Sequence, residues 1–360
     1  MSTSAPDFPS SIDAVTPAWL GGVLGVPLAA IRPERIGEGV GLMGEIYRVG
    51  LDYADGASGP ASVVVKVPAQ TEGSRAQGVA LGMYEAEVRF YNELGPRTPS
   101  GLPRVDHARI VSGTADFVIV MEDLSGLTQV EQTAGMSVDH ALAAVRTLAE
   151  IHAAWWGKVQ TPELEWIPSI VHDRIRMVDG MLPAIWQGFA AGFGSALPEG
   201  GVALGDKFAS NYFNLMQGFA SRPWTLLHQD FRVENLLFGA GPDGDGVVVI
   251  DWQGIGRGPG GYDVAYVLGG SLPTAERRTH ERALVAAYHE VLTANGVDYP
   301  AEAVWDDYRY GMVLGGLAVT LFAAGTLDLT NDRAKALVAS MAERHFTAAL
   351  DHGGVDLIPF

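Results

Sequence analysis

The chain has 360 residues, of which 48% are hydrophobic, and it contains no cysteine. This apolar content predicts a folded chain with a sizeable core, and the absence of cysteine excludes disulfides, thiolate catalysis and zinc–thiolate sites. The 42 acidic and 24 basic residues give a formal net charge of −18, which argues against a nucleic-acid partner or an anionic membrane surface. A cationic substrate is compatible with this charge, although an acidic surface mainly promotes solubility.

The sequence gives no sign of export or of membrane insertion. The stretch MSTSAPDFPSSIDAV at the start has neither a basic region nor an apolar core, so we expect no secretory signal. The apolar stretches 19–31 and 311–325 fall short of the ~20 residues that a membrane span needs. We therefore expect a cytoplasmic protein without a membrane partner, and the oligomeric state is not readable from the sequence.

In chain order, the first third of the sequence predicts a short helix and then a sheet of mostly antiparallel strands. Thr16 and Pro17 form an N-cap signal for a helix that should end near Gly25. Glycine and Asp-Gly turns separate apolar runs that favour strands. We predict strands within 31–49, at 62–68 and as a pair within 104–122, and one helix at 79–95 that Gly95 ends.

After residue 124 the pattern changes to helical periodicity. We predict helices at 137–157, in segments of 168–222 and across 274–350, a turn at 242–245 and a strand at 247–252. The change falls within MEDLSG, residues 121–126, where a strand should end. We therefore expect an α+β chain of two domains, a small antiparallel-sheet domain at 1–122 and a mainly helical domain at 123–360.

The stretch LLHQDFRVENLLFG, residues 226–239, places polar side chains between two apolar segments. Asp230 follows a run that would bury the base of its loop, and a half-buried carboxylate is unfavourable unless it is bonded or functional. If the strands around the 242–245 turn form a hairpin, Asn235 and Asp251 come close together as a hard-oxygen pair that suits Mg²⁺. Asp230 is then left to accept a proton from a substrate hydroxyl, as phosphoryl transfer requires.

The first domain contains groups that suit nucleotide phosphates. Lys66 is a charged residue in an apolar strand and needs an anion, and Glu87 on the following helix can pair with it and hold it toward phosphates. The stretch GEGVGLMGE, residues 37–45, is interpreted as a loop over the phosphates in which Gly37, Gly39 and Gly41 permit close backbone approach.

A further segment should contact the base of a nucleotide. The strand that ends in VIVMEDL is followed by a hinge, made of Met121, Glu122 and Leu124, whose backbone can bond an adenine.

These motifs together resemble the aminoglycoside phosphotransferase and choline-kinase-like group within the protein-kinase-like superfamily. The pattern His-x-Asp-x-x-x-x-Asn followed by a strand ending Ile-Asp-Trp carries the resemblance. More narrowly, TPAWL, EVRFYNEL, IVMEDL, LAEIHAAWW, HQDFRVENLLF and VIDWQ…YDVAYVL are similar to the ecdysteroid-kinase-like branch and its bacterial phosphotransferase relatives. The matches keep the family's order and run from about residue 16 to 270.

The resemblance implies a two-lobed, protein-kinase-like fold and an enzyme that transfers the γ-phosphoryl group of ATP to a small-molecule alcohol, with Mg²⁺. It implies that Asp230 is the catalytic base and that Asn235 and Asp251 hold Mg²⁺. Lys66 would contact the α- and β-phosphates and pair with Glu87. Residues 121–124 would form the adenine hinge.

The sequence also departs from the family pattern. Gln229 stands where many relatives have glycine, which adds bulk and an amide beside the base. Trp252 and Gln253 follow the metal-binding aspartate in place of Phe-Gly. No activation segment ending in Ala-Pro-Glu is present, which disfavours protein substrates.

Other polar and aromatic residues near these motifs have a structural interpretation. His228 is expected to bond backbone carbonyls around its loop, and His152 is expected to pack in the core. We expect Asp263 to cap a helix and to brace the catalytic loop. Trp155 and Trp156 are interpreted as helix-packing residues.

Two alternatives to a kinase remain from the sequence. One is a nucleotide-binding regulatory protein without transfer activity, which the presence of a base disfavours. The other is adenylate transfer on the same fold. The acceptor is also open: acidic residues suit an aminoglycoside or choline-like cation, whereas an apolar helical segment at 157–225 suits a larger, less polar alcohol.

Overall fold

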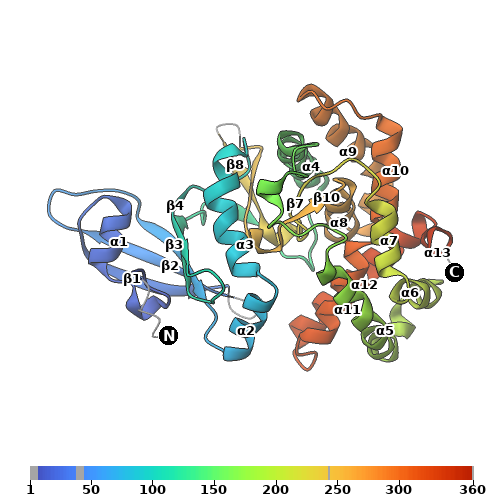
Figure 1. Ribbon diagram of the computed structural model, residues 1–360, viewed down its shortest axis with the longest axis horizontal. Coiled ribbons are helices and arrows are strands. Elements are labelled where there is room, and N and C mark those ends of the chain that lie inside the picture. The colour runs from blue at the N-terminus through green and yellow to red at the C-terminus, as the bar shows by residue number, and fades with distance from the viewer. Residues whose placement is uncertain (1–6, 38–43, 242–243, 359–360) are drawn as a thin grey trace. The chain divides into compact units, whose positions relative to one another are not determined.

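The computed structural model describes residues 7–37, 44–241 and 244–358. The chain divides into two compact units (Figure 1). Unit 1 comprises Met1–Thr98, Leu102–Leu127 and Asp251–Gly254, and unit 2 comprises Pro99–Gly101, Thr128–Ile250 and Ile255–Phe360. Within the described ranges, no helix combines the length and the apolar character that a membrane crossing requires.

The strands of unit 1 form one antiparallel sheet in the order β1-β2-β3-β5-β4, which confirms the predicted sheet. They are β1 Leu28–Ile36, β2 Gly44–Tyr53, β3 Ser62–Pro68, β4 Val105–Ile110 and β5 Phe117–Glu122. Helix α1, Pro17–Leu24, begins where predicted, because the Thr16 hydroxyl accepts the Trp19 N–H at 3.2 Å. Leu20 of α1 packs with valines of β2, β3 and β5 in the core of this unit.

The single helix predicted at 79–95 is confirmed at its end, before Gly95, but its start and the prediction of one helix are wrong. The chain instead forms α2, Glu72–Ala80, and α3, Met83–Arg89, followed by a π-helical turn, Phe90–Leu94. Gly82 separates the helices in the left-handed conformation, with φ of 67°. Tyr84 turns back over α2, where a Cβ at Gly78 would lie 2.4 Å from its ring.

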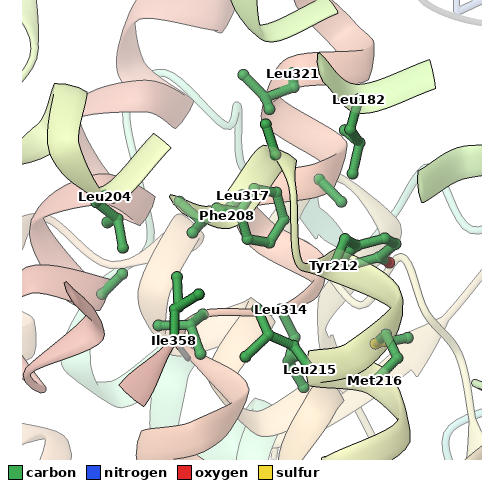
Figure 2. Close-up of a cluster of buried hydrophobic side chains, with 14 of the residues drawn as sticks. Leu182, Leu204, Phe208, Tyr212, Leu215, Met216, Leu314, Leu317, Leu321 and Ile358 are labelled. Atoms are coloured by element: carbon green, nitrogen blue, oxygen red, sulfur yellow. The ribbon is translucent and has the colours of Figure 1, made fainter. Parts of the chain in front are cut away.

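Unit 2 is mainly helical, as predicted. Its helices are α4 Val138–Trp155, α5 Asp173–Phe193, α6 Gly201–Ala209, α7 Tyr212–Phe219, α8 Gly261–Ser271, α9 Thr274–Ala294, α10 Ala301–Gly311, α11 Gly315–Thr326, α12 Asp332–Asp351 and α13 Gly354–Leu357. Helix α4 is capped by Ser137, whose hydroxyl accepts the His140 N–H at 3.1 Å, and it packs through the buried Trp155. Apolar side chains of α5, α6, α7 and α11 share one core, which includes Leu182, Phe208 and Leu317 (Figure 2).

Short strands of unit 2 hold the loop that carries the polar motif. They are β6 Thr128–Gln129, β7 Thr225–Leu227, β8 Leu236–Ala240, β9 Gly246–Val249 and β10 Gly256–Gly258. Strands β8 and β9 are antiparallel with Leu236 opposite Val249, which confirms the predicted hairpin. Strand β7 pairs with β10, so the loop 228–235 is fixed by strand pairing at both of its ends.

Gln229 lies in this loop with φ of 64°, a left-handed conformation that is uncommon for a residue with a side chain. Two neighbouring backbone N–H groups hold the loop there, because those of His228 and Gln229 both donate to the Asp263 carboxylate, at 2.7 and 3.0 Å. The Gln229 side chain lies over Gly256, where a Cβ would come within 2.5 Å of it. Asp263 therefore braces the loop as predicted, but the predicted cap is wrong, because Asp263 lies inside α8 and Gly260 is the N-cap residue.

The left-handed backbone at Gln229 predicts that glycine stabilises the protein more than alanine at this position, the reverse of the usual order. The conformation disfavours a residue with a Cβ by about 1–2 kcal/mol, whereas glycine is otherwise less favourable than alanine by about 0.5–1 kcal/mol. Gln229→Gly should therefore be more stable than Gln229→Ala by about 0.5–1 kcal/mol in urea unfolding.

The exposed Gln187, in the middle of helix α5, is the matched control. There the alanine variant should be the more stable of the two. If the alanine variant were more stable than the glycine variant at both positions, the loop would not impose the left-handed conformation on Gln229 in solution.

Candidate functional site

Unit 1 contains a buried cluster of opposite charges. The Lys66 Nζ atom lies 2.7 Å and 3.0 Å from the Glu87 carboxylate oxygens and 2.9 Å from Asp251 Oδ1. Lys66 and Glu87 are buried, and Asp251 is partly exposed. Burial by itself would lower the pKa of Lys66, but the carboxylates of Asp251 and Glu87 raise it above its ordinary value, so the ammonium stays charged.

The position of Lys66 follows from the alternation of side chains along β3. Val63, Val65 and Val67 face the core that contains α1, so Lys66 faces the opposite side of the sheet. Helix α3 supplies Glu87 to that side. Lys66 lies on β3, which is the central strand of the sheet.

Asp251 is held by the residues that follow it. Trp252 is buried and stacks on Phe90, with ring centroids 3.9 Å apart and planes 10° apart. Gln253 Nε2 donates to Asp251 Oδ2 at 3.2 Å. This explains why Trp-Gln follows the aspartate in this chain. Asp251 adopts φ of 65°, a conformation that aspartate tolerates better than most residues.

The segment predicted to be an adenine hinge begins at the end of β5. Met121 and Glu122 pair with Val64 and Val63 of β3, and Leu124 follows the strand. Asp123, which the sequence interpretation did not single out, fixes this segment because it accepts bonds from Arg48 Nε at 2.9 Å and Ser62 Oγ at 2.6 Å.

The glycine-rich loop is described only at its edges. Gly37 follows β1 with φ of 72°. Gly44 opens β2, where a Cβ would lie 3.3 Å from the Lys66 side chain. The predicted phosphate contacts Gly39 and Gly41 lie outside the described residues.

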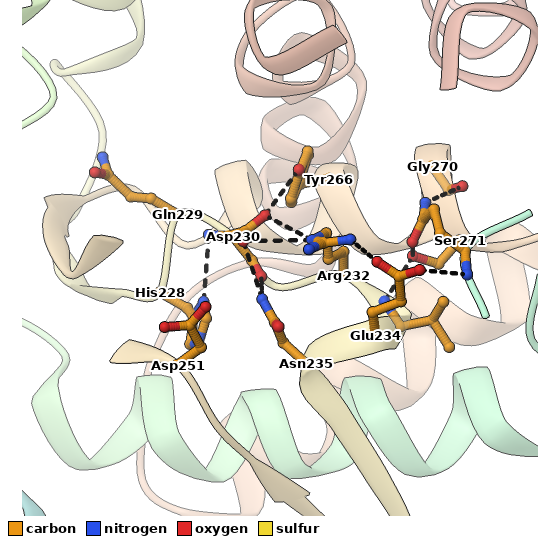
Figure 3. Close-up of polar contacts among 12 residues, drawn as sticks. His228, Gln229, Asp230, Arg232, Glu234, Asn235, Asp251, Tyr266, Gly270 and Ser271 are labelled. Atoms are coloured by element: carbon orange, nitrogen blue, oxygen red, sulfur yellow. Dashed lines mark hydrogen bonds and ion pairs between the residues drawn. The ribbon is translucent and has the colours of Figure 1, made fainter. Parts of the chain in front are cut away.

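Unit 2 contains the second cluster, centred on Asp230 (Figure 3). Its Oδ1 atom accepts the Tyr266 hydroxyl at 3.0 Å, and its Oδ2 atom accepts Asn235 Nδ2 at 3.0 Å. Arg232 Nε lies 3.3 Å from Oδ1. The Asp230 side chain keeps 32% of its surface exposed, so the carboxylate is fixed by its neighbours and still accessible.

The arginine in this cluster is itself held by two acids. Arg232 pairs with Glu234 as well as with Asp230. Burial opposes the charge, but Asp230 and Glu234 raise the pKa of Arg232 above its ordinary value. Arg232 and Tyr266 lie inside the quoted motifs HQDFRVENLLF and YDVAYVL. The sequence analysis gave neither a role, because spacing alone does not reveal which side chains contact Asp230.

The histidines have the structural roles that the sequence predicts. His228 Nδ1 accepts the Asp230 N–H at 3.2 Å, and its Nε2 atom lies 3.0 Å from the carbonyl oxygen of Ile250. His152 is fully buried, and its Nδ1 atom lies 2.7 Å from the Tyr288 hydroxyl.

The side-chain oxygen of Asn235 is a ligand that suits a hard cation. Its Nδ2 atom donates to the backbone oxygen and to the carboxylate of Asp230, at 2.9 and 3.0 Å, which leaves Oδ1 as a ligand. Among the described residues, no group of three or more His, Cys, Asp or Glu side chains has a metal-binding arrangement. A magnesium ion would therefore depend on few protein oxygens and on phosphate oxygens, as is usual for that ion.

Solved structures with the same fold include enzymes that act on small molecules. A candidate aminoglycoside phosphotransferase from Ralstonia eutropha is 16% identical, with a TM-score of 0.52 over 89% of this chain and 93% of that chain. An ethanolamine kinase from Plasmodium vivax is 10% identical, with a TM-score of 0.55 over 89% of this chain and 81% of that chain. These similarities confirm the predicted kinase-like α+β fold.

A search of curated proteins gives no match. The family model that matches is that of the ecdysteroid kinase-like family, over residues 38–297. This range contains Lys66 and Glu87 of the first cluster and all the residues described around Asp230. The match confirms the resemblance seen in the sequence, and the chain belongs to the ecdysteroid kinase-like family.

Proposed function

We propose that the protein is an ATP-dependent kinase that transfers the γ-phosphoryl group of ATP to a hydroxyl group of a small molecule. The observation that carries the proposal is the buried Lys66 ammonium between two carboxylates. Burying the charged groups of Lys66 and Glu87 is unfavourable unless each is paired, and such a cluster adds little stability compared with apolar packing. A role in binding phosphates gives the chain a reason to keep it.

On this proposal, unit 1 binds the nucleotide. Glu87 orients Lys66, and Lys66 donates to the α- and β-phosphates. The backbone of Met121, Glu122 and Leu124 bonds the adenine. Gly37 begins the glycine-rich segment that lies over the phosphates.

Asn235 Oδ1 and the Asp251 carboxylate would hold Mg²⁺. When bound, the ion would neutralise charge on the phosphate oxygens. The protein's own contribution is to orient these oxygens. Asp230 fixes the amide of Asn235, and Gln253 and Lys66 fix the carboxylate of Asp251.

Asp230 would orient the acceptor hydroxyl and take its proton. The hydroxyl oxygen forms a bond to the γ-phosphorus while the bond from that phosphorus to the bridging oxygen of ADP breaks. The proton moves to the Asp230 carboxylate, and ADP leaves with the electron pair of the broken bond. The exposed part of the carboxylate is the side that an acceptor can approach.

Side chains on helix α5 favour a less polar alcohol over a cationic acceptor. Arg174 Nη2, at the start of α5, lies 3.5 Å from the side-chain oxygen of Gln229, the neighbour of Asp230. A guanidinium there repels aminoglycoside or choline-like cations. One and two turns further along α5, Met177 and Met181 are 55% and 47% exposed and offer apolar contacts.

Asp230→Asn tests the proposed base. Mg-ATP should be supplied with a panel of aminoglycosides, macrolides, choline, sugars and steroid-like alcohols, and ADP release should be measured. General-base catalysis contributes about 10²–10⁴-fold, so turnover on the acceptor that stimulates the parent chain should fall by that factor. Attachment of AMP to the acceptor with release of pyrophosphate would instead indicate adenylate transfer, and Mg-ATP binding without any stimulated turnover would favour a non-catalytic nucleotide-binding protein.

Lys66→Met tests the phosphate contact. A hydrogen bond to a charged group contributes about 1.5–3 kcal/mol, so kcat/KM for ATP should fall roughly 10- to 150-fold. Lys335→Met is the matched control, because Lys335 is exposed on α12 and should keep the parent value. Equal values for Lys66→Met and the parent chain would contradict a phosphate role.

A further inference from the structure

Tyr266 is the neutral side chain that contacts the Asp230 carboxylate from α8. Its hydroxyl donates to Oδ1 at 3.0 Å, and its ring is buried. Burial, with the nearby Asp230 charge, raises the pKa of Tyr266 well above its ordinary value, so the phenol keeps its proton. In this hydrogen bond Tyr266 is therefore the donor and the Asp230 carboxylate is the acceptor.

The Tyr266 ring is itself held in place. It stacks on His345, with centroids 5.4 Å apart and planes 8° apart. His345 is buried beside two glycines that leave room for it, since a Cβ would come within 2.4 Å of its ring at Gly270 and within 2.2 Å at Gly316. The phenol therefore has little freedom to leave Asp230.

Helix α8 holds both the backbone of the loop 228–235 and the side chain of Asp230 within it. Asp263 lies one turn before Tyr266 on α8, and residues three apart share a helix face. Asp263 binds the N–H groups of His228 and Gln229, and Tyr266 binds the next side chain along the loop.

We propose that Tyr266 is a positioning residue for phosphoryl transfer, which fixes the orientation of the Asp230 carboxylate by donating a hydrogen bond to Oδ1. A carboxylate offers about four lone-pair positions. Tyr266 occupies one on Oδ1, Asn235 occupies one on Oδ2 and Arg232 Nε lies 3.3 Å from Oδ1, so these contacts oppose rotation of the carboxylate and leave its exposed side for the acceptor. This inference rests on the proposed function, in which Asp230 takes the proton of the acceptor.

Tyr266→Phe removes the hydroxyl and keeps the ring that stacks on His345. Because small displacements of a catalytic group lower rates by up to about 10²-fold, kcat for ADP release should fall roughly 10- to 100-fold. KM for ATP should not change, because the side chains that Tyr266 contacts, Asp230 and His345, are not part of the nucleotide-binding cluster. The rate should be measured with the acceptor that gives the highest turnover and with water as acceptor.

Tyr308→Phe is the matched control. Tyr308 is also a buried tyrosine of unit 2 that donates to a carboxylate, Glu281, at 2.7 Å. Both variants should lose similar thermal stability, but Tyr308→Phe should keep the parent kcat.

The double variant Asp230→Asn with Tyr266→Phe separates positioning from a general structural effect. If Tyr266 acts through Asp230, the double variant should be no slower than Asp230→Asn alone. A Tyr266→Phe rate equal to that of the parent, or a further loss in the double variant, would overturn the inference while leaving Asp230 as the base. A parent chain that releases no ADP with any acceptor, water included, would instead overturn the proposed function and this inference with it.

Discussion

The buried Asp263 carboxylate accepts hydrogen bonds from two successive backbone N–H groups, those of His228 and Gln229. The cluster around Asp230 depends on these two bonds. These bonds hold Gln229 in a left-handed conformation. A buried carboxylate is strongly unfavourable unless it is bonded in this way. The turn that results presents the Asp230 side chain toward Tyr266 and Asn235. Backbone strain at Gln229 therefore accompanies a fixed orientation of the Asp230 side chain.

Charge pairing plays the corresponding part in unit 1. Lys66 reaches Glu87 because β3 alternates its side chains between the two faces of the sheet. It reaches Asp251 because Trp252 anchors the start of the segment 251–254 on Phe90. In both clusters an aspartate is positioned by the residue next to it in the sequence. Trp252 stacks on Phe90 and positions Asp251, and the Gln229 N–H donates to Asp263 and positions Asp230.

Much of the fold, the Lys66–Glu87 pair and the loop around Asp230 were accessible from the sequence. A lysine inside an apolar strand singled out Lys66, and the spacing of Asp230 and Asn235 identified the loop, because these signals are local. The helix at 79–95 was mispredicted, since the packing of Tyr84 over α2 is a tertiary contact that periodicity does not encode. Tyr266 was missed for a similar reason: on a helix buried all round, apolar pattern does not indicate which residue faces the loop.

The most direct test of the account follows the transferred group itself. The parent chain should be incubated with Mg-ATP carrying ¹⁸O on its γ-phosphoryl oxygens and with the stimulating alcohol, and the products should be analysed by mass spectrometry. Transfer of the γ-phosphoryl group should give a phosphorylated alcohol that carries the label, together with unlabelled ADP. Transfer of an adenylyl group to the alcohol, or label that appears only in inorganic phosphate with every alcohol tested, would contradict it.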